Sequence, residues 1–157
     1  MNNSPSLRFL AVTFVCGAAT VTTFAEDKKI ALKKAPVAVQ KTIADQLKGG
    51  TLRELVFEVE NGKTVYEAEL AADGRARTLA IDATGTLLES EAAVELSAIP
   101  AAAREGLLRE AGKGSISEVE EVTKNGAVSY EAMVKEKGKK DREIVVGADG
   151  KAITAGK

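Results

Sequence analysis

The chain has 157 residues, and its 22 Lys and Arg side chains nearly balance its 23 Asp and Glu side chains. This balance argues against nucleic acid or an anionic membrane surface as a partner. The sequence has no histidine and a single cysteine, Cys16, so imidazole catalysis is excluded and an internal disulfide cannot form.

The first 25 residues have the layout of a secretory signal peptide. Arg8 precedes an apolar run at residues 9–19, and small and polar residues follow up to Ala25. We expect cleavage after Ala25, with Ala19 as the alternative, because the apolar run falls short of the roughly 20 residues that span a bilayer. Lipidation at Cys16 is a weaker alternative. The mature protein is then expected in the periplasm or outside the cell, without membrane contact and without cysteine.

The remaining chain consists of two copies of one unit, residues 26–92 and 93–157. A shift of 64 residues places Asn61-Gly62 on Asn125-Gly126 and Tyr66-Glu67-Ala68 on Tyr130-Glu131-Ala132. One inserted residue near positions 137–140 changes the shift to 65 for the rest of the copy. Repetition of this kind indicates two copies of one supersecondary motif.

Each copy is expected to begin with a helix. Pro36 and Pro100 stand where a first helical turn tolerates proline. Apolar side chains then recur every fourth residue, which is typical of one helix face; they are Val39, Ile43 and Leu47, and then Ala103, Leu107 and Ala111. Glycines after each run end the helices.

The rest of each copy is predicted to be a four-stranded antiparallel meander. A two-residue turn at Asn61-Gly62 would pair Phe57 with Tyr66, and one at Asp73-Gly74 would pair Ala68 with Leu79. The turn at 82–85 would set Leu79 beside Leu88. The predicted fold is therefore α+β, with two tandem repeats that each pack one helix on a four-stranded sheet.

In the second copy the same reasoning places Tyr130 beside Val146, Ala132 beside Ile144, and Ile144 beside Ile153. The inserted residue is expected to give a three-residue loop, Lys137-Gly138-Lys139. The join at residues 91–94 is short and lacks Pro, Gly and Ser, so we expect the copies to pack closely.

This pattern resembles the PepSY-like family, which includes modules similar to the beta-lactamase inhibitor protein. The shared features are the apolar pair before a proline, the helix, the N-G-x-x-x-Y-E-A hairpin and the D-G turn. The resemblance runs from Ile30 to about Thr154. It implies exported tandem modules without catalytic residues, linked in some relatives to peptidase inhibition, and hence a partner of the peptidase type.

Four residues of the second copy form the candidate interaction site. Glu120 is predicted to lie opposite Glu131 on the outer sheet face, and Glu121 to lie near Tyr130 on the inner face. The simpler interpretation of Tyr66 and Tyr130 is that both are core residues. The other outer glutamates, Glu67, Glu69 and Glu118, are typical of a solvated face. The basic run 135–142 is expected either to contact an anionic partner or to prevent the sheet edge from pairing with another chain.

These observations favour a non-catalytic, inhibitor-like binding module of the cell envelope, with no cofactor and no metal site assigned. One alternative is an envelope sensor of cations or small ligands through the acidic face, and another is a weak hydrolase using Glu120 and Glu131. The second copy is expected to be the less stable half. It has smaller core residues, Gly106 within its helix, and Glu121 where the first copy has Phe57.

Overall fold

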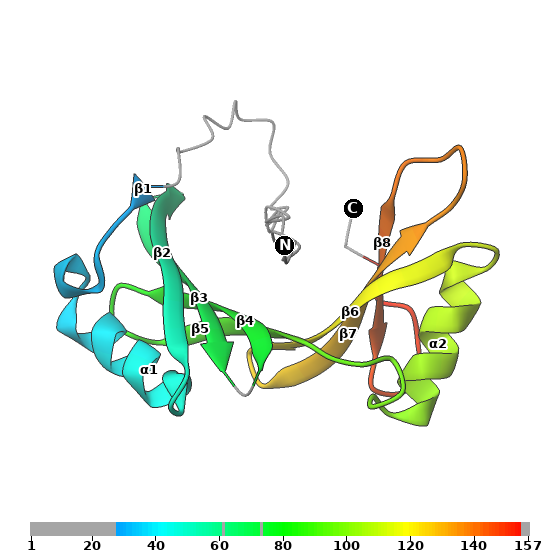
Figure 1. Cartoon of the computed structure of the whole chain (residues 1–157), viewed down its shortest axis with the longest axis horizontal. Helices are drawn as coiled ribbons and strands as arrows, with labels where there is room; N and C mark the ends of the chain where they lie inside the picture. Colours follow the sequence, from blue (N-terminus) through cyan, green and yellow to red (C-terminus); the bar gives the residue numbers. More distant parts are fainter. Residues whose placement is uncertain (1–27, 61, 73, 155–157) are drawn as a thin grey trace.

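The computed structural model describes residues 28–60, 62–72 and 74–154 (Figure 1). The predicted leader, its cleavage site and Cys16 lie outside these residues. A 3₁₀ turn at Leu32–Lys34 precedes the first helix. The elements are β1 (Lys28–Lys29), α1 (Val37–Leu47), β2 (Thr51–Glu60), β3 (Lys63–Ala72), β4 (Arg75–Asp82), β5 (Leu87–Ala93), α2 (Ala101–Ala111), β6 (Ser115–Lys124), β7 (Ala127–Lys135) and β8 (Arg142–Gly147).

All the strands belong to one antiparallel sheet, ordered β1 to β8 as in the chain. The α+β class is thereby confirmed. Separate sheets for the two copies were expected, but β5 pairs directly with β6, for example Glu91 with Val122. This pairing satisfies backbone groups that two separate sheets would leave open at their edges. Figure 1 shows the sheet as a curved trough with both helices on its convex side.

Most of the predicted register is confirmed. Phe57 pairs with Tyr66, and Ala68 pairs with Leu79. In the second half Tyr130 pairs with Val146 and Ala132 with Ile144. Asn61 and Asp73, on which two of the turn predictions rest, lie outside the described residues.

Two predicted pairs are wrong. Leu79 lies opposite Ser90 rather than Leu88, a shift of two residues. The turn is one residue wider than expected, since the Asp82 N–H donates to Thr86 O, and the β4–β5 ladder adds an irregularity between Ala80 and Ile81. Ile153 donates its backbone N–H to Val145, so it does not lie beside Ile144. A one-residue slip moves a side chain to the opposite face of a sheet, and the Ile153 side chain is accordingly exposed.

The second half also departs from the predicted four strands and short loop. After β8 the chain returns through a single bridge, Val146 with Ala152, instead of a full strand. The β7–β8 connection spans residues 136–141 rather than three residues. Gly138 within it has a φ of 78°, the left-handed conformation expected of this glycine.

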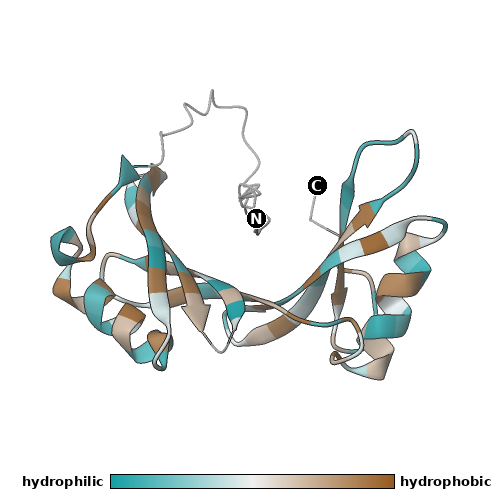
Figure 2. Ribbon diagram, in the orientation of Figure 1, coloured by the Kyte–Doolittle hydropathy of each residue, from teal (hydrophilic) through white to brown (hydrophobic). Residues whose placement is uncertain are grey.

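Each helix covers its own core cluster on the convex face of the sheet, and Figure 2 shows the apolar stripes that meet there. Val39 and Ile43 of α1 pack on Leu55, Leu70, Leu79 and Ile81. The second cluster combines α2 with the last three strands; it contains Ala103, Leu107, Ala111, Val119, Tyr130, Ala132, Val134, Ile144 and Val146. Its helix contributes smaller side chains, as the sequence indicated.

An arginine of the sheet reaches the C-terminal end of each helix. Arg77 Nη1 donates to Gln46 O at 3.4 Å, and Arg142 Nη2 donates to Glu110 O at 2.8 Å. The two arginines occupy equivalent positions of the repeat. Each therefore supplies a cation and a donor to helical carbonyl groups that lack intrahelical partners.

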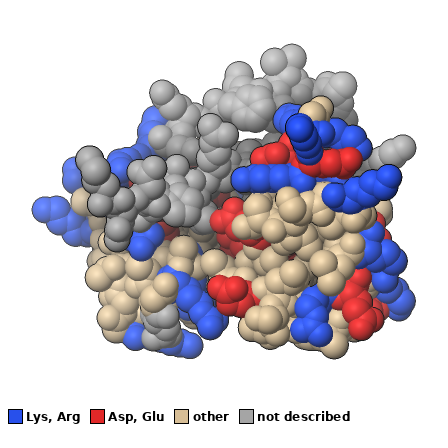
Figure 3. All heavy atoms as spheres, turned by 45° about the vertical axis from the view of Figure 1, so that its right-hand side comes forward, with Lys and Arg blue, Asp and Glu red and all other residues tan. Residues whose placement is uncertain are grey.

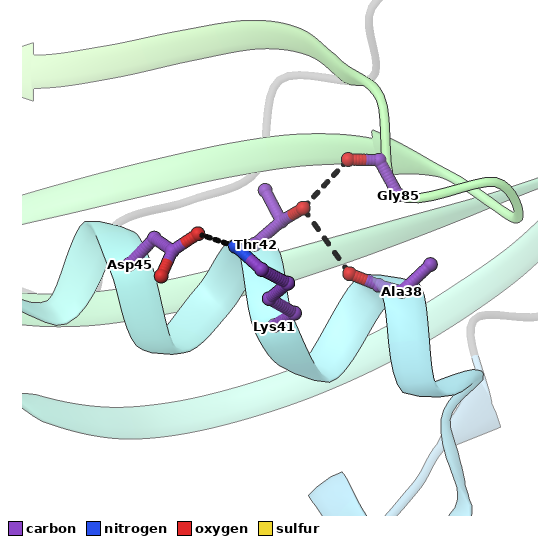
Figure 4. Close-up of polar contacts among 5 residues, drawn as sticks. All are labelled: Ala38, Lys41, Thr42, Asp45 and Gly85. Carbon is purple, nitrogen blue, oxygen red and sulfur yellow. Dashed lines mark hydrogen bonds and ion pairs between the residues drawn. The ribbon is translucent and has the colours of Figure 1, made fainter.

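The turn that follows the third strand of each copy docks against the helix. In the first half Thr42 Oγ1 donates to Gly85 O at 2.6 Å (Figure 4). In the second half Gly106 takes the place of Thr42, and a Cβ there would lie 2.9 Å from the carbonyl carbon of Gly150. Arg109 Nη2 donates to Gly150 O at 2.6 Å instead. Gly106, expected only as a propensity cost, is thus required by a close backbone approach.

Candidate functional site

The concave face of the sheet, opposite the helices, is lined by carboxylates. Strand alternation places on it the residues that point away from the two core clusters. We call the following set the acidic face: Glu67 and Glu69 on β3, Glu89 and Glu91 on β5, Glu118 and Glu120 on β6, Glu131 on β7 and Glu143 on β8. Between them stand small and apolar residues such as Ala80, Val122 and Val145.

The centre of the acidic face combines both halves of the repeat. Glu120 lies directly opposite Glu131, as the sequence predicted. Glu91 of the first half joins them because β5 pairs with β6, where Ala93 stands opposite Glu120. Glu91, Glu120 and Glu131 are all partly buried. Three carboxylates from three adjacent strands therefore share one half-buried region.

Burial and mutual repulsion raise the pKa values of these carboxyls. The pKa of Glu91 rises to about 7, first through burial and then through the charges of Glu120 and Glu89. Burial also raises the pKa of Glu131, and the Glu143 carboxyl adds repulsion and a hydrogen bond. The pKa of Glu120 is raised by burial and by Glu118. The region is therefore costly to ionise without a positive partner.

Few cations of the protein itself reach this face. Lys124 Nζ lies 2.6 Å from a carboxylate oxygen of Glu89. By contrast, Glu91, Glu120 and Glu131 form no ion pair with any residue that the structure describes. The hydroxyl oxygen of Thr78, the residue opposite Glu91, is buried and has no hydrogen-bond partner among the described residues. The three central carboxylates, Glu91, Glu120 and Glu131, thus have no neutralising cation among the described residues.

Glu121 and Tyr130 lie on the opposite, convex face and belong to a different environment. Tyr130 is 5 % exposed, and its hydroxyl donates to Glu121 Oε2 at 3.2 Å. Burial and the nearby Glu121 carboxylate raise the pKa of Tyr130. The four residues predicted as one interaction site are therefore neighbours on β6 and β7 but are divided between two faces. The tyrosine hydroxyl is thus the polar partner of the Glu121 carboxylate.

Replacing Tyr130 by phenylalanine should lower the free energy of unfolding by about 1 to 2 kcal/mol, because a partly buried carboxylate loses its donor. The matched control is Tyr66→Phe at the equivalent position of the first half, where the hydroxyl bonds to no described residue. This control should change the stability by less than about 0.5 kcal/mol. Urea unfolding of both variants measures the difference, and equal losses would contradict the role given to the hydrogen bond.

The geometry offers little to a metal ion or an enclosed ligand. Within residues 28–60, 62–72 and 74–154, no group of three or more carboxylates is arranged to hold a metal ion. An open groove of about 460 Å³ lies instead at the β1 edge, where Lys29, Leu32 and Arg53 are among its walls. No helix in the described part of the chain is both long enough and apolar enough to cross a membrane.

Sequence reasoning identified Glu120 and Glu131 but missed Glu91 as their neighbour. The alternation of β5 already placed Glu91 on the outer face. What it could not supply was the pairing between β5 and β6, which brings the two copies into one sheet. The short join between the copies was the one available signal for that pairing.

No protein-family profile matches the chain, and no curated protein matches it. Solved structures do share its fold. A BLIP-like protein from Bacteroides fragilis is 16 % identical, with a TM-score of 0.60 over 76 % of this chain and 84 % of that one. A protein of proposed periplasmic location from Bacteroides eggerthii is 15 % identical, with a TM-score of 0.64 over 76 % and 86 %. A DUF2874 family protein from Bacteroides ovatus is 13 % identical, with a TM-score of 0.64 over 77 % and 86 %.

At these identities the similarity concerns the fold. The fold is BLIP-like, in agreement with the predicted resemblance to modules of the beta-lactamase inhibitor protein. Membership of the PepSY-like family stays a prediction.

Proposed function

We propose that this protein is an exported, non-catalytic binding module of the cell envelope and that the acidic face is its binding surface. The observation that carries the proposal is the set of half-buried carboxylates, Glu91, Glu120 and Glu131, which no described cation neutralises. A partner that brings Lys or Arg side chains to this face would remove the cost of ionising them.

The mode of recognition follows from what the surface contains. Protein interfaces often use exposed aromatic anchors. Here Phe57 and Tyr66 contact each other on the convex face, and Tyr130 is buried there. Charge must therefore contribute more to recognition than aromatic burial. The partner in this proposal is a basic surface of an envelope or secreted protein, such as a peptidase.

The inhibitor-like role and the location also belong to the proposal. Likeness to a BLIP-like protein supports the inhibitor-like part of the proposal. A periplasmic or secreted location is supported by the predicted leader and by the proposed periplasmic location of the Bacteroides eggerthii protein.

The proposal is tested by retention of an envelope protein on immobilised bait at low salt. The face variant combines Glu91→Gln, Glu120→Gln and Glu131→Gln. The control variant removes three exposed carboxylates elsewhere, through Asp45→Asn, Glu95→Gln and Glu105→Gln. We expect the same protein to be retained by the wild type and by the control, and lost by the face variant. Equal retention by the face variant, or no retained protein, would refute the proposal.

A further inference from the structure

The loop between β7 and β8 is longer than the fold requires. In the first half, β3 and β4 remain paired as far as Ala72 and Arg75. In the second half the last pair is Val134 with Arg142, and residues 136–141 separate the strands. Because the first half closes with a short turn, the extension in the second half is not needed to form the sheet. Figure 1 shows this hairpin projecting from the rim of the trough.

This segment, residues 135–142, is strongly basic, and we call it the lysine loop. It carries five cationic side chains against two acidic ones. Arg142 is used by the helix carbonyls, and Lys139 Nζ pairs with Glu136 at 2.8 Å. Lys135, Lys137 and Lys140 are exposed and pair with no residue that the structure describes. Three lysines therefore remain available at the rim.

The lysine loop and the acidic face complement each other in charge. Glu91, Glu120 and Glu131 at the centre of the face pair with no described cation, and Lys135, Lys137 and Lys140 of the loop pair with no described carboxylate. Figure 3 shows Asp and Glu side chains near the middle of the molecule, and Lys and Arg side chains, with further Asp and Glu among them, toward its right-hand side. The formal net charge is only −1, so two copies do not repel each other at long range.

We propose that the lysine loop of one molecule docks into the acidic face of a second copy. The contact joins two different surfaces, so it either closes by symmetry, with each loop in the other copy's face, or continues from copy to copy. The inference goes beyond the proposed function, because it gives the same face an occupant when no envelope partner is bound. A partner with a basic surface would compete with the loop for Glu91, Glu120 and Glu131.

Sedimentation velocity of the purified chain beginning at Glu26 tests the proposal. The wild type should form dimers or larger species at roughly 20 mM salt, and association should weaken at least tenfold at about 0.5 M salt because the charges are screened. A wild type that stays monomeric at low salt and hundreds of micromolar protein would overturn the proposal. The assay contains no envelope protein, so its failure leaves the proposed function standing and is distinguishable from it.

Two variants, each lacking one side of the contact, sharpen the test. The loop variant combines Lys135→Gln, Lys137→Gln and Lys140→Gln, and the face variant is the triple Glu→Gln change described above. Each alone should be monomeric. Mixed together they should form a 1:1 dimer and nothing larger, since one supplies the intact face and the other the intact loop.

A lysine control separates the lysine loop from general charge effects. It changes exposed lysines elsewhere, through Lys33→Gln, Lys48→Gln and Lys113→Gln, and should associate as the wild type does. Loss of association in this control, or a mixture of the two defective variants that stays monomeric, would show that the loop and the face do not meet.

Discussion

Replacing Gly106 by alanine should lower the free energy of unfolding by about 2 to 3 kcal/mol, in the range found for overpacked sites. The new Cβ would lie closer to the Gly150 carbonyl than the 3.0 Å that real Cβ atoms respect. The obstacle is backbone of a turn held by the Arg109 hydrogen bond, so it cannot rotate away as a side chain would. The substitution must push α2 and the 147–150 turn apart.

The sign of this effect distinguishes it from helix propensity. In an exposed helix interior, glycine to alanine gains about 1 kcal/mol. The control is therefore Ala44→Gly at an exposed position of α1, which should cost only about 1 kcal/mol through propensity. Thermal and urea unfolding of the two variants measure both effects. A stabilised Gly106→Ala protein would show that the helix and the turn are not in contact.

In the two halves, the helix contacts the turn after the third strand through different residues. The first half uses the hydroxyl of Thr42 to bind the turn, whereas the second half removes the side chain and binds the turn through Arg109. The sequence alignment showed the exchange of Thr42 for Gly106 but assigned it to helix propensity. Only the approach of the Gly150 backbone reveals why a side chain cannot stand there. Contacts between distant segments are invisible to local propensity.

The register of strand pairing could be predicted where a two-residue turn determines it. The prediction failed where the ladder of paired residues is irregular. The pairs Phe57 with Tyr66 and Glu120 with Glu131 follow from two-residue turns that determine strand pairing. The β4–β5 hairpin has a wider turn and a bulge, neither of which the sequence marks, so Leu79 lies opposite Ser90. The β7–β8 connection is wider than the three residues expected because a turn closes from Glu136 to Lys139, where the Lys139 N–H donates to Glu136 O at 3.0 Å.

One part of the candidate site could be predicted because it depends on a local hairpin, whereas the other part depends on a long-range strand pairing. Glu120 opposite Glu131 needed only the β6–β7 hairpin, which is local in the chain. Their association with Glu91 needed the β5–β6 pairing, which spans a whole helix and its connections. The division of Glu121 and Tyr130 from the other pair follows from strand alternation. The predicted register already set Glu120 and Glu131 on the outer face and Glu121 and Tyr130 on the inner face, although the four residues were grouped as one site.

The protein should be more stable at pH 5 than at pH 8. A carboxyl whose folded-state pKa is raised holds its proton in the folded state at pH values where the unfolded chain has lost it. Its stabilising contribution is complete below about pH 4.5 and disappears as the pH rises through the folded pKa. For Glu91 that window runs from 4.5 to about 7. Burial raises the pKa values of Glu120 and Glu131 in the same direction, so their contributions add to that of Glu91.

The two carboxyls whose pKa values are lowered, those of Asp82 and Asp149, do not reverse this fall in stability between pH 5 and pH 8. Hydrogen bonds from Thr84 and Lys151 lower the pKa values of Asp82 and Asp149, respectively. A lowered pKa contributes stability above the unfolded value, and that stability is lost only as the pH falls through the folded pKa. Both groups are therefore ionised in the folded and unfolded states across this window. Neither group therefore opposes the change that the acidic face produces.

Glu91→Gln should consequently raise the free energy of unfolding at pH 8 by about 1 to 2 kcal/mol, a value reduced for the solvent that still screens this carboxylate. At pH 5 the gain should be much smaller, because the carboxyl it replaces is still neutral in the folded protein. The exposed Glu105→Gln is the control and should stay within about 0.5 kcal/mol of the wild type at both pH values. Urea unfolding at pH 5 and pH 8 supplies the four differences.

Added salt should raise the stability of the wild type at pH 8, because it screens the repulsion that Glu91 feels from Glu120 and Glu89. An equal gain for Glu91→Gln at both pH values would mean that the acidic face carries no like-charge cost, and the reason for expecting a cationic partner would disappear with it.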